Sequence, residues 1–235
     1  MSEWKTKRFW TDVTVVPSGP GFSITLDGRG VKTPGKSPLV VPSPAMADAI
    51  AAEWAAQGEV IDPLTMPATR AANSAIEKIM PHRAAVIDAL AEFGASDLVC
   101  YRADGPSELV ARQAAAWDPL LAWAKEALGA ELRTTTGVMF LAQPAEALAA
   151  LQAPLEEATA FELAGLHDLI MLAGSLVIGL KAREVDDPAP LWAASRVDET
   201  YQADIWGHDE EAMEAAEEKA MAFANAHRFY RMAQV

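Results

Sequence analysis

The first part of the chain shows short alternations of apolar and polar positions, separated by residues that favour tight turns. Asp27-Gly28, between two β-branched segments, is a strong hairpin signal. The alternating segments predict strands at Asp12–Val16, Phe22–Leu26, Gly30–Thr33 and Leu39–Val41. Together they indicate a small β-meander or barrel.

After this region the apolar positions recur every three to four residues, which is typical of helices. Ser43-Pro44 has the chemistry of an N-cap followed by a first-turn proline. Helices are predicted at Ala45–Gln57, Thr69–Met80, Arg83–Phe93, Ser107–Leu128, Ala145–Ala160, Glu162–Lys181, Pro190–Trp206 and Glu210–Tyr230. Prolines fall at joints between them, and Arg133–Val138 suits a short extended piece.

These elements predict an α+β protein with two domains. Residues 1–67 form a small antiparallel β-rich N-terminal domain that includes one helix. Residues 68–235 form a larger all-α helical C-terminal domain. The 48 alanines of the chain all lie at or after Ala45, and alanine-rich helices suit a closely packed bundle.

The charge of the chain also changes near residue 44, where the alanines begin. The net charge is −14, yet residues 1–44 carry six basic and three acidic side chains. Residues 184–218 hold twelve acidic residues and a single basic one. This balance excludes a protein that binds nucleic acid through its phosphates, which needs a basic surface. A single cysteine excludes an internal disulfide framework.

The most apolar run is Leu163–Leu180, which contains His167 and Asp168. A membrane span needs about 20 consecutive apolar residues, so this run is better interpreted as a buried core helix. The N-terminus lacks the apolar region of a secretory signal. We therefore expect no stable membrane insertion.

Gly30–Ser37, with the sequence GVKTPGKS, matches the phosphate-binding loop of nucleotide-binding proteins letter for letter. That loop works because a helix begins directly after it and aims its N-terminus at the phosphates. Here an apolar run bracketed by Pro38 and Pro42 follows, which predicts a strand. A basic turn is therefore favoured over the alternative, a small ATP-binding enzyme.

Other sequences that resemble catalytic or metal sites have simpler interpretations. His208-Asp209-Glu210-Glu211 is interpreted as the acidic first turn of a helix, His167-Asp168 as a buried polar pair, and Cys100 as a core residue. We predict no catalytic residue, no metal site and no cofactor.

The predicted helix Pro190–Trp206 carries a stripe of chemically unusual residues. Trp192, Glu199 and Trp206 follow one another at seven-residue intervals, with Gln202 on the same stripe. Tryptophan is enriched where proteins bind one another, and a carboxylate can pair with an arginine of a partner. The alternative is that both tryptophans pack against a neighbouring helix while Glu199 caps or bridges internally.

Several short segments resemble, in order and approximate spacing, the assembly chaperones of the alpha subunit of the ATP synthase catalytic sector. They are Phe22–Arg29, Val31–Pro34, Leu39–Ser43, Ala52–Gln57, Met66–Thr69, Cys100–Arg102, Trp117–Pro119, Ser175–Val177, Asp198–Gln202 and Trp206-Gly207. The resemblance covers nearly the whole chain.

This resemblance implies a non-catalytic chaperone that binds the unassembled alpha subunit and shields its beta-subunit interface until the hexamer assembles. It also implies a bacterial, cytoplasmic member, whereas organellar members act in the mitochondrial matrix. Glu199 matches an acidic position of the family's C-terminal motif, and Trp54 matches a position with a structural role. We predict the partner-binding residues to be Glu199, Trp192, Trp206, Gln202 and Asp198.

Overall fold

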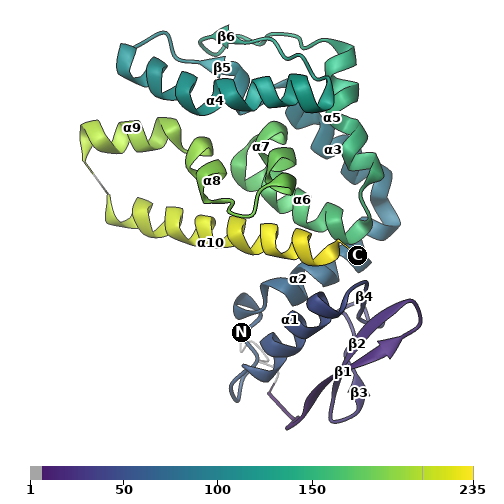
Figure 1. Ribbon diagram of the computed structural model, residues 1–235. Coiled ribbons are helices and arrows are strands. Elements are labelled where there is room, and N and C mark those ends of the chain that lie inside the picture. Colours follow the sequence, from purple (N-terminus) through teal and green to yellow (C-terminus); the bar gives the residue numbers. More distant parts are fainter. Residues whose placement is uncertain (1–6, 208, 235) are drawn as a thin grey trace. The chain divides into compact units, whose positions relative to one another are not determined.

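The computed structural model describes residues 7–207 and 209–234, which group into two compact units. The first unit comprises residues 7–83, 159–165 and 228–234, and the second comprises residues 84–158 and 166–227. The α+β class with a β-rich N-terminal part and a helical remainder is confirmed (Figure 1). The predicted domain boundary at residue 67 stays a prediction.

The sheet of the first unit is antiparallel and is centred on its second strand. Its strands are β1 (Val13–Ser18), β2 (Gly21–Leu26), β3 (Arg29–Gly30) and β4 (Val40–Val41). β2 pairs with the other three, with Val13 opposite Leu26 and Leu26 opposite Arg29. Asp27 and Gly28 both have positive φ, as a two-residue hairpin turn requires.

One helix of the first unit packs on this sheet. α1 (Pro44–Ala55) begins as predicted, because the Ser43 hydroxyl accepts a hydrogen bond from the Met46 N–H at 3.1 Å. Ile24, Met46 and Ile50 are fully buried between helix and sheet.

The segment that follows is helical for longer than predicted. α2 (Pro67–Ser74) continues through a π-helical turn (Ala75–Ile79) and a 3-10 turn (Met80–His82) into α3 (Arg83–Ala95). The predicted helices Thr69–Met80 and Arg83–Phe93 are therefore joined without a break at Pro81, contrary to the expected joint between them. Pro81 has no backbone N–H and would interrupt a regular α-helix. The chain accommodates it by forming the π and 3-10 turns instead.

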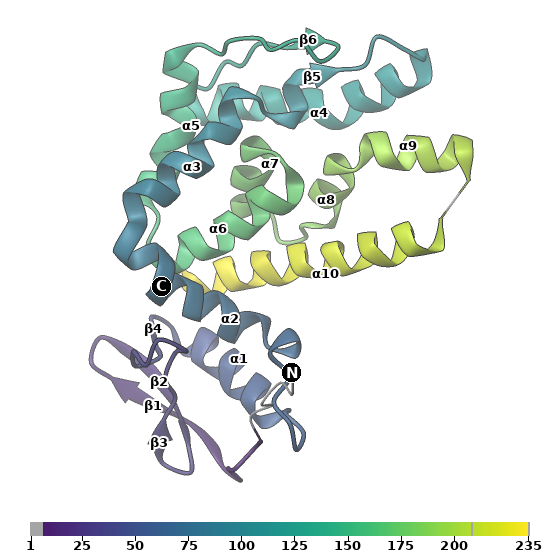
Figure 2. The same cartoon turned by 180° about the vertical axis from the view of Figure 1, so that it is seen from behind.

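The second unit consists mainly of helices (Figure 2). Besides α3 they are α4 (Ser107–Leu128), α5 (Ala145–Glu157), α6 (Ala160–Ala173), α7 (Leu176–Lys181), α8 (Ala189–Ser195), α9 (Val197–Trp206) and α10 (Glu210–Ala233). Residues 160–165 of α6 and 228–233 of α10 belong to the first unit. The last turn of α3 is followed by a 3-10 turn (Leu98–Cys100), and another (Ala182–Glu184) follows α7. The short strands β5 (Tyr101–Arg102) and β6 (Thr135–Thr136) pair in parallel, so the extended piece predicted at Arg133–Val138 is confirmed at its centre.

Two helices predicted as continuous are broken. Glu162–Lys181 divides into α6 and α7 at Gly174, whose φ of +64° ends one helix, and at Ser175, whose hydroxyl caps the next by accepting from the Ile178 N–H. Pro190–Trp206 divides into α8 and α9 at Arg196, with φ −117° and ψ 18°. The interpretation of Leu163–Leu180 as one buried helix was therefore wrong in its continuity, although Leu176–Leu180 is buried.

A buried carboxylate stabilises the first of these breaks. Asp97 is fully buried; it accepts hydrogen bonds from the Ser175 hydroxyl at 2.6 Å and the Val177 N–H at 3.0 Å. Burial raises the pKa of the Asp97 carboxyl to about 6, although its hydrogen bonds act in the opposite direction. Asp97 thus joins the end of α3 to the start of α7 within the core of the second unit.

Among the described residues, no helix combines the length and the apolar character needed to cross a membrane.

Candidate protein-binding surface

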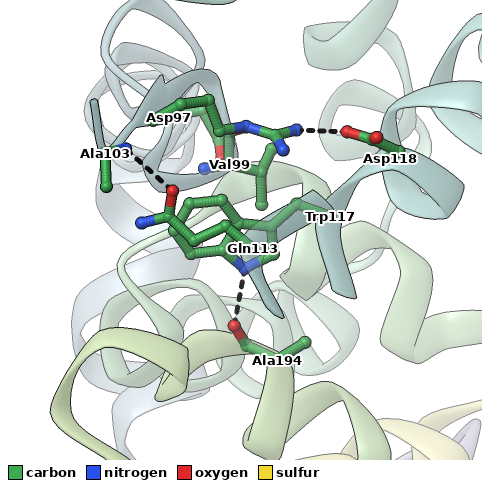
Figure 3. Close-up of polar contacts among 8 residues, drawn as sticks. Asp97, Val99, Ala103, Gln113, Trp117, Asp118 and Ala194 are labelled. Atoms are coloured by element: carbon green, nitrogen blue, oxygen red, sulfur yellow. Dashed lines mark hydrogen bonds and ion pairs between the residues drawn. The ribbon is translucent and has the colours of Figure 1, made fainter. Parts of the chain in front are cut away.

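Two side chains of α4, Trp117 and Gln113, hold α8 and α9 in place; Figure 3 shows both side chains, with the bond of Trp117 to Ala194 and that of Gln113 to Ala103. The indole N–H of Trp117, which is almost completely buried, donates to the Ala194 carbonyl at 2.7 Å. Gln113 is equally buried; its Oε1 accepts from the Ala103 N–H at 2.8 Å and its Nε2 donates to an Asp198 oxygen at 2.7 Å. Both ends of the Gln113 amide are therefore satisfied, as burial requires.

Arg112 of α4 holds the second half of α9. Its guanidinium pairs with Asp204 and with Glu108, and it lies over the Tyr201 ring at 5.2 Å from the centroid. Asp204, and then Glu108, raise the pKa of Arg112 above its ordinary value. The side of α9 that carries Tyr201 is thereby anchored to α4.

Arg196, at the break between α8 and α9, organises the residues around it. Its guanidinium pairs with Glu199 at 2.9 Å and lies 5.8 Å from the centroid of the Trp192 ring. Trp192 is half-buried, and its ring contacts Phe223 of α10 with a centroid separation of 5.6 Å. These contacts connect α8, α9 and α10 at one end of α9.

The side of α9 that carries Glu199 and Gln202, and the C-terminal end of the helix, are open to solvent. Glu199 and Gln202 are exposed, and Ile205 and Trp206 at its C-terminal end are 55% and 86% exposed. A tryptophan exposed to this extent is unusual in a protein with an apolar core large enough to bury it. The surface formed by Glu199, Gln202, Ile205 and Trp206 is hereafter the α9 surface.

The five predicted partner-binding residues therefore have different surroundings. Glu199, Gln202 and Trp206 lie on the α9 surface, whereas Trp192 contacts Phe223 and Asp198 accepts from Gln113. They do not form one stripe along a continuous helix, because Trp192 precedes the break at Arg196. Their binding role stays a prediction.

Trp54 lies in the first unit. It is half-buried, and its ring meets that of Trp10 edge-on at 5.2 Å. The preceding Glu53 caps α2, since its carboxylate accepts from the Ala68 and Thr69 N–H groups at 2.7 and 2.8 Å. Sequence reasoning missed this cap, which joins residues fifteen positions apart.

The phosphate-loop sequence at Gly30–Ser37 forms a turn. The Thr33 N–H donates to the Ser37 carbonyl at 2.9 Å, and the chain continues through Leu39 into β4 rather than into a helix. The Gly35 N–H donates to the carboxylate of Glu77. An anionic side chain thus occupies one of the backbone N–H groups that a phosphate would need. This segment therefore does not have the geometry of a phosphate-binding loop.

The remaining candidate residues form no site in the part of the chain that the structure describes. His167 and Asp168 contact each other at 2.9 Å but are exposed, so the interpretation as a buried pair was wrong. Cys100 is buried, and burial raises the pKa of its thiol to about 12, which makes it unreactive. Asp209 caps α10 by accepting from the Ala212 N–H, whereas His208 lies outside the described residues. Among the described residues there is no cluster able to bind a metal.

The Gln113–Asp198 contact gives a testable prediction. We expect Gln113→Glu to lower the free energy of unfolding by about 2 kcal/mol, because two carboxylates would then face each other at a buried site. Adding Asp198→Asn restores a donor opposite the new acceptor, and at least half of the loss should return. Urea denaturation of the single and double variants measures this coupling; purely additive effects would show that the two residues are independent.

Known proteins resemble this chain over its whole length. The family of ATP12 chaperone proteins matches residues 7–125. Atp12 from Paracoccus denitrificans is 45% identical, with a TM-score of 0.94 over 99% of this chain and 100% of that chain, and a point variant of the same protein gives the same values. A protein from Agrobacterium tumefaciens is 41% identical, with a TM-score of 0.92 over 97% of this chain and 86% of that chain.

Proposed function

Because the chain belongs to the ATP12 family of chaperones for ATP synthase assembly, we propose that its client is the alpha subunit of the catalytic sector. The chaperone holds the unassembled subunit and covers its interface with the beta subunit until the hexamer forms. It acts as a binding protein rather than as an enzyme, and in the cytoplasm of a bacterium. The bacterial relatives support this location.

The observation that carries the proposal is the exposed end of α9. Trp206 is 86% exposed and Ile205 55% exposed at the C-terminal end of a helix that Asp198 and Tyr201 anchor to α4. An exposed aromatic residue on a rigid support is the usual centre of a protein-binding surface. The nearby carboxylate of Glu199 adds a group that can pair with a basic residue of the client.

The general test is co-expression of the alpha subunit with the tagged chaperone, followed by purification. We expect the alpha subunit to gain solubility and to co-purify in the absence of the beta subunit. Adding purified beta subunit should then release it. If the alpha subunit neither co-purifies nor gains solubility, the proposed client is wrong.

A charge reversal tests the α9 surface. We expect Glu199→Lys to weaken binding of the alpha subunit at least about tenfold, because it places a positive charge where the client is expected to present one. The free energy of unfolding should change by less than about 0.5 kcal/mol, since the Arg196–Glu199 pair is exposed. Glu126→Lys, an equally exposed change on α4, is the matched control and should bind normally. A large loss of stability in Glu199→Lys would instead identify Glu199 as an internal support.

A further inference from the structure

Three consecutive apolar side chains project into solvent between β6 and α5. Val138, Met139 and Phe140 are 94%, 78% and 68% exposed, and they are hereafter the apolar tip. No charged residue occurs between Arg133 and Glu146, although the net charge of the chain is −14. Soluble proteins avoid such runs unless the residues bind a partner, because an exposed, uncharged apolar run promotes aggregation.

The loop that carries the apolar tip is held at both ends. On the N-terminal side β6 pairs with β5, and the Gly137 N–H donates to the Arg102 carbonyl at 2.8 Å. On the C-terminal side the Gln143 amide bonds to the backbone of Arg133: its Oε1 accepts from the N–H at 2.8 Å and its Nε2 donates to the carbonyl at 2.9 Å. Gly137, with φ +82°, turns the chain between these two attachments. The chain is thus fixed where it enters and where it leaves the apolar tip.

The support of this loop leads back to α4. The Arg102 guanidinium pairs with Asp118 of α4 at 2.9 Å and lies 5.2 Å from the centroid of the Trp117 ring. Figures 1 and 2 show, from two sides, β5 and β6 on one side of α4 and α9 on the other. The loop and the α9 surface are therefore separate structures supported by the same helix, and each can be altered without the other.

The apolar tip is too small to form a stable interface alone. Its three side chains can bury no more than roughly 500 Å², whereas a stable complex buries about 800 Å² on each partner. Contact between the tips of two copies would stay below that size, and each copy would bring a net charge of −14. The tip therefore suits a partner that is also held elsewhere. The α9 surface is the other contact that the proposed function assigns to the client.

The lack of charge around the apolar tip specifies the surface that it fits. A charged group of the partner would be buried there without a counter-charge, which is unfavourable. The core of an interface between subunits is apolar and depleted in charged residues, and phenylalanine and methionine are enriched in it. The flexible thioether of Met139 can also adapt to an irregular apolar surface. The tip thus complements the kind of surface that one subunit buries against another.

We propose that the apolar tip inserts into an apolar, uncharged depression on the client, within the interface that the beta subunit later covers. This inference rests on the proposed function for the identity of the client. It adds a second contact, which is made by packing rather than by ion pairing. Because the α9 surface already holds the client nearby, a small contact at the tip increases the overall affinity strongly.

The test is the affinity of the full-length chaperone for purified alpha subunit. We expect combined Met139→Gln and Phe140→Gln to weaken it at least about tenfold, because two apolar side chains that would be buried become polar. Met171→Gln, at an exposed methionine of α6, is the matched control and should bind within about twofold of the wild type. Phe140→Leu keeps an apolar side chain and should bind within about threefold. An unchanged affinity of the double variant overturns the proposal.

Charges of either sign at position 140 distinguish packing from ion pairing. Phe140→Lys and Phe140→Glu should each weaken binding at least about tenfold, and the loss should persist at high salt. The loss in Glu199→Lys should instead shrink as salt is added. If either charge at position 140 leaves the affinity unchanged, or if salt removes the loss, the tip makes an electrostatic contact and the proposal is wrong.

A photo-crosslinking residue at position 139 identifies what the tip touches. It should capture the alpha subunit within its interface with the beta subunit, and added beta subunit should abolish the crosslink. Capture of only a second chaperone molecule would refute the proposal. The same conclusion follows if the wild type sediments with neutral phosphatidylcholine vesicles and Phe140→Glu does not, because the tip would then bind a lipid surface.

Failure of the client proposal gives a separate result. If wild-type chaperone does not bind the alpha subunit, the client is wrong, and the other purified subunits of the catalytic sector are tested in turn. A subunit that binds should lose at least about tenfold in affinity for the Met139→Gln, Phe140→Gln chaperone, and binding of no subunit overturns the role of the tip. If Glu199→Lys weakens binding of the alpha subunit and the double tip variant does not, the proposed function stands and the tip has no part in it.

Discussion

Replacing Trp117 with alanine is expected to lower the free energy of unfolding by about 4 kcal/mol. Trp117 is 1% exposed, so its removal leaves a large cavity beneath α8. It also removes the hydrogen bond to the Ala194 carbonyl and the support for the Arg102 guanidinium, which lies 5.2 Å from the ring centroid. Urea denaturation measures the loss.

Trp117→Phe separates the two contributions. Phenylalanine keeps most of the packing but leaves the Ala194 carbonyl without its donor, for a loss of about 1–2 kcal/mol. Hydrogen exchange should accelerate in Val197–Trp206, because α8 and α9 are held through this bond. Trp123→Phe is the matched control on the same helix: the Trp123 indole N–H donates to the exposed Glu184 carboxylate at 2.9 Å, so little stability should be lost. Equal effects of the two substitutions would show that the Ala194 bond has no special role.

The second large effect concerns the pH dependence of stability through Asp97. Its pKa is about 6 in the folded protein and near 3.8 when unfolded. The folded state therefore binds more protons between these values, and unfolding releases them. This contribution to stability is fully present below pH 3.8 and is lost as the pH rises through 6, with an amplitude of about 3 kcal/mol.

Asp97→Asn isolates this contribution because asparagine does not titrate. The stability of the wild type relative to Asp97→Asn should be about 2 kcal/mol greater at pH 4 than at pH 7, because part of the contribution is gained only below pH 4. Denaturation of both proteins at the two pH values gives this difference, in which the other carboxylates cancel. Asp88→Asn, at an exposed position of α3, should show no such change. A difference independent of pH would mean that Asp97 titrates at its ordinary value.

Elements bounded by strong local chemistry were predictable from sequence. α4 was predicted to the residue, since Pro106 precedes it and Gly129, with φ +74°, ends it. The hairpin at Asp27-Gly28 was equally predictable, because few other pairs accept positive φ at both positions. In each case the residues that determine the local structure lie close together in the sequence.

The breaks and the anchoring of α9 depend on contacts distant in sequence. Gly174-Ser175 had the composition of a helix end followed by a cap, but the strongly apolar run around it favoured the prediction of one continuous helix. The bond of Gln113 to Asp198 joins residues 85 positions apart, so no local pattern distinguished the supporting Asp198 from the exposed Glu199 beside it. Sequence spacing thus located the α9 surface without showing which residues support it.

The first half of α10, Glu210–Met221, is exposed except for the half-buried Ala216 and Ala220, and its composition bears on the entropy of any association there. Alanine loses no side-chain rotamer freedom when it is covered, and a helix already formed loses little backbone freedom. Most of the conformational entropy that usually opposes association is therefore absent on the chaperone side. The ordering of a partner segment would then be the main entropic term, so a partner already folded at that segment would be bound more tightly than an unfolded one.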